Sequence, residues 1–287
     1  GTILATGVPS YSSNGQTSGK VRVYQNTHNN WIQLGQDIVG ETIGDEFGGS
    51  VSLSSNGTVI AVGAPDNDGN GPASGHVRIY QYVNGTWTQL GQDIDGEASN
   101  DFSGWSVSLS SDGTIVAIGA HRNGNDSGHV RIYQYANNSW SQLGQDIDGE
   151  GSANFSGTSV SLSSDGTIVA IGSPTALNQA GNGRSGQVQI YQYTNNNWIQ
   201  LGQDIHGESS DDHSGESVSI SADGSVVAIG APYNDGNGSR SGHVRIYQYS
   251  DGSWTQLGSD IEGEYDDDYI GKSVSLSADG TIVAISS

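Results

Sequence analysis

The 287-residue sequence contains no cysteine and no methionine. Without cysteine there is no disulfide and no thiolate metal site, so packing and strand hydrogen bonds must hold the fold, and any bound cation needs oxygen ligands. No apolar run approaches the roughly 20 residues of a membrane-spanning helix, so we predict no membrane insertion. Because the chain opens on glycine, we expect a mature product or an internal segment whose targeting peptide has been removed.

Basic residues are scarce as well. Nine Lys and Arg stand against 31 Asp and Glu, which gives a formal net charge of −22. A surface of this sign repels nucleic-acid phosphates and anionic lipid headgroups, so we predict no nucleic-acid partner. In a salty medium counter-ions screen such charges within about 8 Å. We therefore interpret the acidity as a solvated exterior rather than as a surface for one cationic partner.

An internal repeat dominates what the sequence does contain. Five tryptophans are each followed by Gln-Leu-Gly at the same offset, with spacings of 56, 53, 58 and 56 residues: Trp31, Trp87, Trp140, Trp198 and Trp254. The repeat divides a single domain, residues 1–287, into units of about 1–42, 43–98, 99–151, 152–209 and 210–265, with a partial unit at 266–287. These are called the first to fifth units and the partial unit below.

The second unit predicts four antiparallel strands, at residues 50–54, 59–62, 76–82 and 87–94. The first strand alternates serine with apolar residues, which suits a crowded central position. The second is apolar at consecutive positions, so both of its faces must be covered. The third alternates polar and apolar residues, and the fourth is the most polar. Tight-turn sequences such as Asn84-Gly85 join the strands as hairpins.

A four-stranded unit with covered faces and a polar outer edge, repeated every 53–58 residues, is typical of a β-propeller blade. We predict an all-β propeller of about five four-stranded antiparallel blades, with a parallel β-solenoid as the second choice. Residues 1–5 and 280–284 both match the second strand of the unit, so this strand occurs six times. Either a five-bladed ring closes with one surplus strand, or the chain is a window of a longer array.

The second unit begins with Asp45-Glu46-Phe47-Gly48, then Ser50-Val51, then Val62-Gly63-Ala64-Pro65. These motifs resemble the FG-GAP repeat of integrin-α-type propellers. We assign the Phe position of successive units to Phe47, Phe102, Phe155, His213 and Tyr269. The resemblance covers the whole chain. It implies an extracellular or cell-surface location and a non-enzymatic scaffold, adhesion or recognition role, with a protein or glycan partner at the cell surface or extracellular matrix.

Calcium is the one possible cofactor. Many FG-GAP repeats carry a D-x-D-x-D-G loop between their first two strands, whereas this chain has only a Ser-Asp-Gly-Thr turn there. The nearest alternative is the loop after the second strand, where Asp66, Asp68 and Asp235 are candidate ligands because alternating Asp and Asn oxygens suit a hard cation. The equivalent loops of other units lose most carboxylates, so a polar turn is the alternative interpretation.

Each unit also carries Asp-Ile-x-Gly-Glu after its fourth strand. A catalytic carboxylate pair needs two unlike environments, and fivefold repetition supplies like ones, so we predict no enzyme. We expect these acids to cap turns or to meet the strand arginines Arg22, Arg78, Arg131 and Arg245. The fourth unit has Gln189 at the arginine position. Its changes at residues 176–183, Gln187 and Gln189 remove charge, and we interpret them as drift of the sequence.

Histidines recur beside these arginines, at His76, His129 and His243, but Lys20 and Gln187 hold the same position in the other units. We therefore expect no histidine metal site common to all units, and we expect these side chains to face outward.

Two alternative functions stay open: a multivalent carbohydrate-binding propeller, and an accessory propeller of a secreted hydrolase. The candidate glycan-stacking residues occur once per unit near the end of the third strand: Tyr82, Tyr135, Tyr193 and Tyr249. Asn84, Asn137 and Asn237 begin Asn-x-Ser/Thr sequons in predicted surface turns and are candidate glycosylation sites.

Overall fold

The computed structural model describes residues 2–13, 16–181 and 183–287 of an all-β chain. Within these residues the helical content is one four-residue turn, α1 (Asn123–Asp126). No helix of the described chain is long and apolar enough to cross a bilayer. Within the described residues the strands form five antiparallel sheets of four or five strands and two of two strands, which confirms the predicted class and the hairpin pairing.

The first sheet contains β1 (Ile3–Val8), β4 (Lys20–Thr27), β5 (Asn30–Gln33) and β6 (Ile38–Val39), beside a small ribbon of β2 (Ser12–Ser13) and β3 (Gln16–Thr17). Residue 1, which belongs to the predicted strand at 1–5, lies outside the described residues. The last sheet pairs β27 (Ser273–Leu276) with β28 (Val283–Ser286).

Four five-stranded sheets between them repeat one arrangement. Their strands are β7 (Ser50–Leu53), β8 (Val59–Ala64), β9 (His76–Val83), β10 (Thr86–Gln89) and β11 (Ile94–Asp95) in the second unit; β12 (Ser106–Leu109), β13 (Ile115–Ala120), β14 (His129–Ala136), β15 (Ser139–Gln142) and β16 (Ile147–Asp148) in the third; β17 (Ser159–Leu162), β18 (Ile168–Ser173), β19 (Gln187–Thr194), β20 (Asn197–Gln200) and β21 (Ile205–His206) in the fourth; and β22 (Ser217–Ile220), β23 (Val226–Ala231), β24 (His243–Ser250), β25 (Ser253–Gln256) and β26 (Ile261–Glu262) in the fifth.

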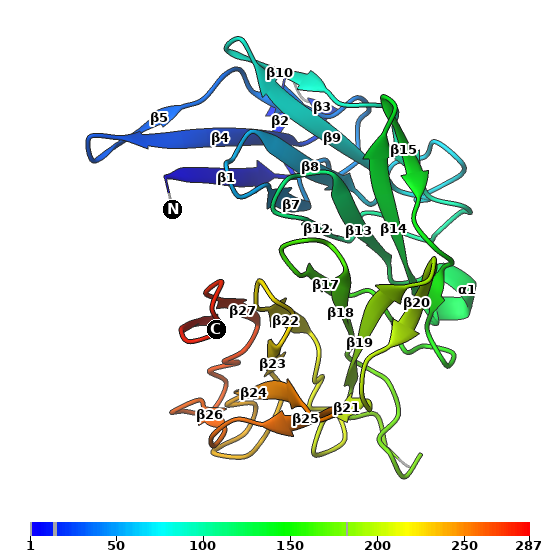
Figure 1. Ribbon diagram of the computed structural model, residues 1–287, viewed down its shortest axis with the longest axis vertical. Helices are drawn as coiled ribbons and strands as arrows, with labels where there is room; N and C mark the ends of the chain where they lie inside the picture. The colour runs from blue at the N-terminus through cyan, green and yellow to red at the C-terminus, as the bar shows by residue number, and fades with distance from the viewer. Residues whose placement is uncertain (1, 14–15, 182) are drawn as a thin grey trace.

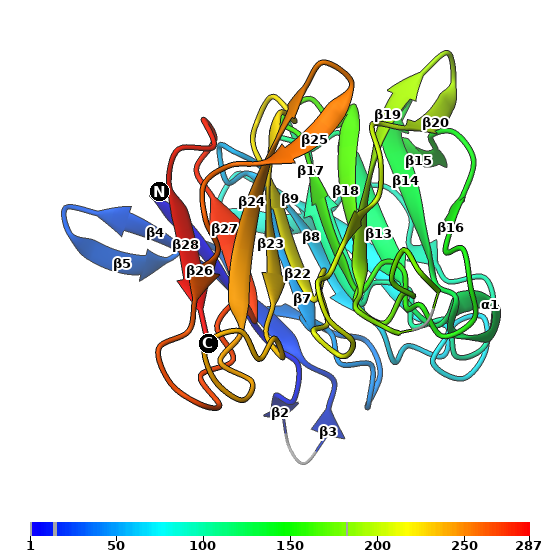
Figure 2. The ribbon, with the colours of Figure 1, turned by 90° about the horizontal axis from the view of Figure 1, so that it is seen from below.

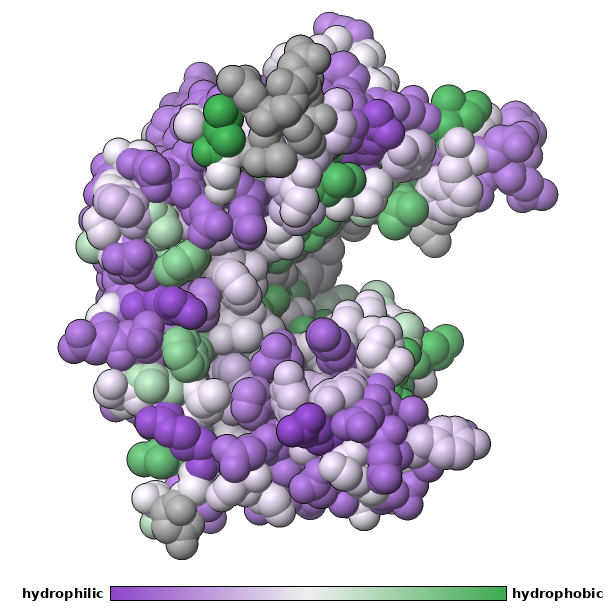
Figure 3. All heavy atoms as spheres, turned by 180° about the vertical axis from the view of Figure 1, so that it is seen from behind, coloured by the Kyte–Doolittle hydropathy of each residue, from purple (hydrophilic) through white to green (hydrophobic). Residues whose placement is uncertain are grey.

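The sheets stand side by side in an open arc (Figure 1). The short strands that begin each unit line the inside of the arc, and the hairpin strands β10, β15, β20 and β25 lie on its outside. The view from below shows the sheets stacked face to face (Figure 2), and the view from behind shows the opening, with hydrophilic residues over most of the outer surface (Figure 3).

The strands β8, β13, β18 and β23 are buried along their whole length, as predicted for strands covered on both faces. Each packs between its own sheet and the next. In one such layer Val77 and Ile79 of the second unit meet Val116 and Ile118 of the third. The hydrophobic core is therefore a series of layers between sheets rather than one central cluster.

The fourth predicted strand, 87–94, is broken. It splits into β10 and β11, which both pair with β9. Between them Gly91 has φ +78°, a left-handed conformation that glycine adopts without strain. The break turns the carbonyl of Leu90 toward the third unit, where the indole of Trp140 donates a hydrogen bond to it at 2.7 Å.

Serine hydroxyls join the units on the inner side. The Ser52 hydroxyl accepts a hydrogen bond from the Leu109 amide of the next unit at 2.9 Å, and the Ser50 hydroxyl donates to the Gly104 carbonyl at 2.7 Å. The same two bonds recur at each of the next three junctions. The alternating serines of the first strand therefore bond across units, because only small side chains fit where the sheets converge.

A tryptophan clasp joins the units on the outer side. Besides the bond from its indole to Leu90, Trp140 forms two backbone hydrogen bonds with the side chain of Gln92. The Trp140 amide donates to Gln92 Oε1 at 3.1 Å, and Gln92 Nε2 donates to the Trp140 carbonyl at 2.7 Å. Trp87, Trp198 and Trp254 are held in the same way by the unit before them. Each of these four indoles is only 3% exposed, whereas Trp31 of the first unit is 48% exposed.

Ring closure through strand pairing is absent from the described residues. β27 and β28 pair only with each other, and the first sheet pairs only within itself. In Figure 1 the two terminal sheets face one another across the opening of the arc. The count of five blades therefore stays a prediction.

The clasp predicts a difference between two equivalent tryptophans. Trp140→Phe removes the indole donor and leaves the Leu90 carbonyl unpaired in a buried junction, so we expect a loss of about 1–3 kcal/mol in the free energy of unfolding. Trp31→Phe removes no described hydrogen bond and should change it by less than about 0.5 kcal/mol. Urea denaturation of both variants measures the difference, and equal losses would contradict the clasp.

Candidate functional site

The assignment of the Phe position was wrong by one residue in the second unit. Phe47 bridges Gly19, and the equivalent bridges of later units use Ser103, Ser156, Ser214 and Ile270. Phe102, Phe155, His213 and Tyr269 instead match Glu46, and all five have φ between +52° and +57°. Phe47 is fully buried against Tyr80, so it extends the core where the third, fourth and fifth units place a serine.

Two of the candidate calcium ligands accept hydrogen bonds from backbone amides of their own loops. The Asp68 carboxylate accepts a hydrogen bond from the Ala73 amide, and the Asp235 carboxylate accepts one from the Arg240 amide. Burial, together with the charges of Asp68 and Asp45, raises the pKa of Asp66. The groups of described residues that come close enough to share an ion include none of these three candidates. Calcium binding there stays a prediction.

The four candidate glycan-stacking tyrosines pack against the tryptophan of their own unit. In the third unit the rings of Tyr135 and Trp140 are 5.2 Å apart, and the other three pairs repeat this geometry. The packing accounts for one tyrosine per unit without a ligand. Among the sequons, Asn84 and Asn137 lie in exposed turns, whereas the Asn237 amide donates to the Gly263 carbonyl at 2.8 Å.

The acids of the Asp-Ile-x-Gly-Glu motif meet the strand arginines, as predicted. In the second unit Arg78 contacts Asp93 at 2.6 Å and Glu41, from the preceding unit, at 2.5 Å. Burial raises the pKa of Asp93, but hydrogen bonds from Arg78 and Gln89 outweigh burial and hold this pKa below its usual range. Arg78 thus pairs with two carboxylates, one from its own unit and one from the unit before.

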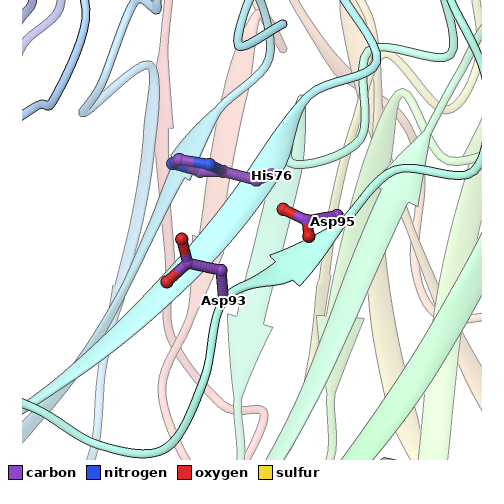
Figure 4. A group of neighbouring side chains, drawn as sticks. All are labelled: His76, Asp93 and Asp95. Atoms are coloured by element: carbon purple, nitrogen blue, oxygen red, sulfur yellow. The ribbon is translucent and has the colours of Figure 1, made fainter. Parts of the chain in front are cut away.

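The strand histidines are not outward-facing, contrary to the sequence expectation. His76, His129 and His243 are 1–2% exposed, because the first residues of their strands lie between two sheets. Burial and the neighbouring arginine lower the pKa of all three. Figure 4 shows His76 beside Asp93 and Asp95 at the junction of β9 and β11, and the third and fifth units each bring a histidine beside two acids as well.

The fourth unit keeps both carboxylates but loses the cation between them. The Gln189 amide donates to Glu150 at 3.2 Å and to Asp204 at 3.0 Å, so it takes the place that Arg78 has in the second unit. No ion pair involves Glu150 or Asp204 among the described residues. The nearby Arg184 instead donates to the carbonyls of Ala153 and Thr175.

A cleft of about 860 Å³ opens at the same place. Glu150, Gln187, Asp204, His206 and Tyr247 line it, with Leu177 and other residues of the 176–183 loop, of which residue 182 lies outside the described chain. Gln187 is 4% exposed, and no hydrogen bond of its side chain is described. The Nδ1 atom of His206 is buried and has no hydrogen-bond partner among the described residues.

The electrostatics of the cleft differ from those of the other junctions. Burial and the charges of Glu150 and Asp204 together raise the pKa of Tyr191 to about 12. At the equivalent Tyr80, the charge of Arg78 opposes this rise. The fourth unit therefore holds two carboxylates that no arginine, lysine or histidine of the described chain pairs with. From the sequence, Gln187 and Gln189 indicated only a loss of charge. The cleft depends on how the residues around it pack in three dimensions, which the sequence does not reveal.

A second irregular feature is an aromatic patch on one edge of the arc, consisting of Phe102, Trp105, His121 and Phe155. The rings of Trp105 and His121 are 4.2 Å apart, and Phe102 and Phe155 lie within 6 Å of the same imidazole. Trp105 is 44% exposed. Tyr233, which follows the fifth-unit equivalent of His121, contacts His213 and Tyr269 in a similar group. Trp105, the one tryptophan outside the repeat, was missed from the sequence, although its irregular position was a visible signal.

The patch predicts a specific pH dependence. Burial and the Arg122 charge lower the pKa of His121 to about 4, so between pH 6.5 and 4 this histidine is protonated in the unfolded chain but neutral in the folded chain. The contribution of His121 to the free energy of unfolding is therefore fully present above pH 6.5. It is lost as the pH falls toward 4, by at most about 1.4 kcal/mol per pH unit. His121→Phe removes this pH-dependent contribution. In urea denaturation, the free energy of unfolding should therefore fall more steeply with decreasing pH for wild type than for the variant. Parallel curves would contradict it.

Comparison with solved structures shows the propeller-like fold. Hydrazine synthase of Kuenenia stuttgartiensis aligns over 94% of this chain and 68% of its own, with a TM-score of 0.60 and 12% identity. The periplasmic gluconolactonase of Pseudomonas aeruginosa aligns over 99% and 74%, with a TM-score of 0.60 and 16% identity. TolB from Acinetobacter baumannii aligns over 88% and 50%, with a TM-score of 0.50 and 17% identity. At these identities the likeness concerns the fold alone.

No curated protein sequence matches the chain. The FG-GAP repeat family matches it at residues 41–80 and 207–247. These segments run from the end of one unit into the third strand of the next, and each contains the strand histidine and arginine. The chain therefore carries FG-GAP repeats at two places, consistent with an FG-GAP-type propeller family.

Proposed function

We propose that the protein is a non-enzymatic recognition module of a secreted or cell-surface protein, and that it binds a cationic group in the fourth-unit cleft. The observation that carries the proposal is Gln189 in the arginine position, between two carboxylates that form no ion pair with any described residue. FG-GAP repeats and periplasmic neighbours of like fold are compatible with an extracellular or periplasmic location.

The second unit supplies the template for the ligand. There a guanidinium bridges the two carboxylates that correspond to Glu150 and Asp204. Glutamine is shorter than arginine and neutral, so it keeps the hydrogen bonds but leaves the negative charge in place. Charge-assisted hydrogen bonds from a guanidinium to carboxylates are about twice as strong as neutral ones. A ligand that presents an arginine side chain would therefore restore the arrangement found in the second unit.

The surroundings of the two acids favour recognition over catalysis. Both carboxylates bond the same neutral amide, and Asp204 also accepts from Gln200 at 2.6 Å. The two acids thus share one hydrogen-bond partner, whereas acid–base catalysis by a carboxylate pair needs two unlike environments. The buried Gln187 amide and the His206 ring offer further polar contacts to a bound peptide.

The probe for this site is a short peptide, acetyl-Gly-Arg-Gly-amide, with acetyl-Gly-Gln-Gly-amide as its neutral match. Backbone NMR shifts of wild-type protein should change around Glu150, Asp204 and His206 with the arginine peptide alone. The changes should weaken at high salt, since the charges are partly exposed. Gln189→Arg should weaken binding at least tenfold, because the variant supplies its own guanidinium.

Arg78→Gln provides the reciprocal variant. It converts the second unit to the fourth-unit arrangement and should create a second set of peptide-dependent shifts near Asp93. Thermal unfolding of both variants checks that the fold is intact. Equal peptide binding by wild type and Gln189→Arg, or no arginine-specific shift at millimolar peptide, would overturn the proposal.

Carbohydrate binding is a second candidate because Trp105 exposes its ring beside Phe102 and Phe155. Exposed aromatic faces stack on the apolar faces of sugars. On a glycan array we expect any signal to be lost in Trp105→Ala and kept in Trp31→Ala, which removes an equally exposed indole at the end of the arc. A signal that survives Trp105→Ala would exclude this patch.

A further inference from the structure

The junction of the fourth and fifth units brings together one imidazole and two carboxylates. His243 begins β24, Asp260 immediately precedes β26, and Glu208 follows β21 of the preceding unit. One potential ligand atom from each lies within 4.8 Å of the others. His243 is 1% exposed, and neither of its ring nitrogens has a hydrogen-bond partner within the part of the chain that the structure describes. A buried imidazole without any partner is costly unless something else binds it.

The spacing of these groups suits an ion better than a hydrogen bond. His243 Nδ1 lies 3.6 Å from Asp260 Oδ2, beyond the range of an N–H···O hydrogen bond. In tetrahedral zinc sites the metal lies about 2.0–2.2 Å from nitrogen and oxygen ligands, which places two ligand atoms about 3.4 Å apart. The observed separation is therefore close to one edge of a zinc coordination sphere.

The neighbouring arginine does not neutralise Asp260. In the second unit Arg78 bonds directly to Asp93. In the fifth unit Arg245 turns away: it donates to the His206 carbonyl at 2.8 Å and approaches Glu208 at 3.5 Å. The described hydrogen bond to the Asp260 side chain comes from the neutral amide of Gln256. Asp260 and one Glu208 oxygen are thus open to a cation.

The first unit shows that this position accepts a positive charge. Lys20 stands where His243 stands, and its ammonium lies 3.1 Å from Asp37, the counterpart of Asp260. Lys20 is 6% exposed, so a buried cation at this point is stable when an acid faces it. The fourth unit has the uncharged Gln187 instead, which shows that the fold also tolerates an amide here.

We propose that Glu208, His243 and Asp260 bind a Zn²⁺ ion, with a fourth position open to water. Imidazole and carboxylate ligands suit zinc, and the two carboxylates balance its charge. The ion joins the fourth unit to the fifth. The third unit repeats the set as Glu97, His129 and Asp146 and takes a second ion.

The test is equilibrium dialysis of the full chain against buffered Zn²⁺ at pH 7.5, followed by metal analysis. His243→Gln copies the residue that the fourth unit already has, so we expect it to fold and to bind one equivalent less than wild type. Asp260→Asn should do the same, and His129→Gln with His243→Gln should lose both equivalents. His28→Gln alters an exposed turn outside these groups and should leave the stoichiometry unchanged.

Zinc should also raise the thermal unfolding midpoint of wild type, because an ion held only by the folded chain stabilises it. This shift should shrink in His243→Gln and persist in His28→Gln. Zinc binding that is unchanged by His243→Gln, or no binding by wild type, would overturn the proposal. The outcome is independent of the cleft, since Gln189→Arg leaves all three zinc ligands in place.

Discussion

The architecture depends on the hydrogen bonds by which each unit holds the next. On the outer side a tryptophan indole donates to a leucine carbonyl of the preceding unit, and a glutamine from that unit brackets the tryptophan backbone. On the inner side serine hydroxyls bond the next strand. No sheet closes a core alone, because its buried strands are covered by its neighbours. The Trp-x-Gln-Leu-Gly-Gln segment therefore serves two junctions at once: its tryptophan contacts the unit before, and its Leu-Gly-Gln contacts the unit after.

Because charged residues of two units meet at each junction, a substitution in one unit can change the charge of that junction locally. At the junctions into the second and fourth units, the residue at the arginine position bonds one acid from each unit, so a single substitution there alters a charged junction without affecting the clasp. Arg78 fills its junction completely, whereas Gln189 leaves two charges and a cleft. In the sequence, the loss of the arginine at Gln189 is explained by drift. In the structure, this loss coincides with a cleft of about 860 Å³, which drift does not explain.

The acidity of the chain has a structural component that composition conceals. The recurrent aspartates are not simply solvated: Asp37 and Asp93 bond arginines, and Asp112 accepts hydrogen bonds within its own tight turn. The third to fifth units are different, because among the described residues Asp146, Asp204 and Asp260 accept hydrogen bonds from a glutamine and have no direct arginine partner. Glu150 has no arginine partner there either. Both the proposed cationic-ligand site and the proposed zinc site lie where the repeated acids outnumber the cations among the described residues.

The sequence by itself determined the all-β class, the unit length, the strand pairing and the pairing of motif acids with strand arginines, because hydrophobic periodicity and turn residues act locally and recur in every unit. Tertiary structure decided the rest. Strand 87–94 breaks because Leu90 must reach Trp140 of the next unit, and Phe47 differs from Phe102 because the two occupy different φ positions. The histidines are buried, although their alternation with apolar residues indicates an outward face, because a neighbouring sheet covers them. Residues from adjacent units meet at each candidate site, and no local pattern records which residues of two units face one another.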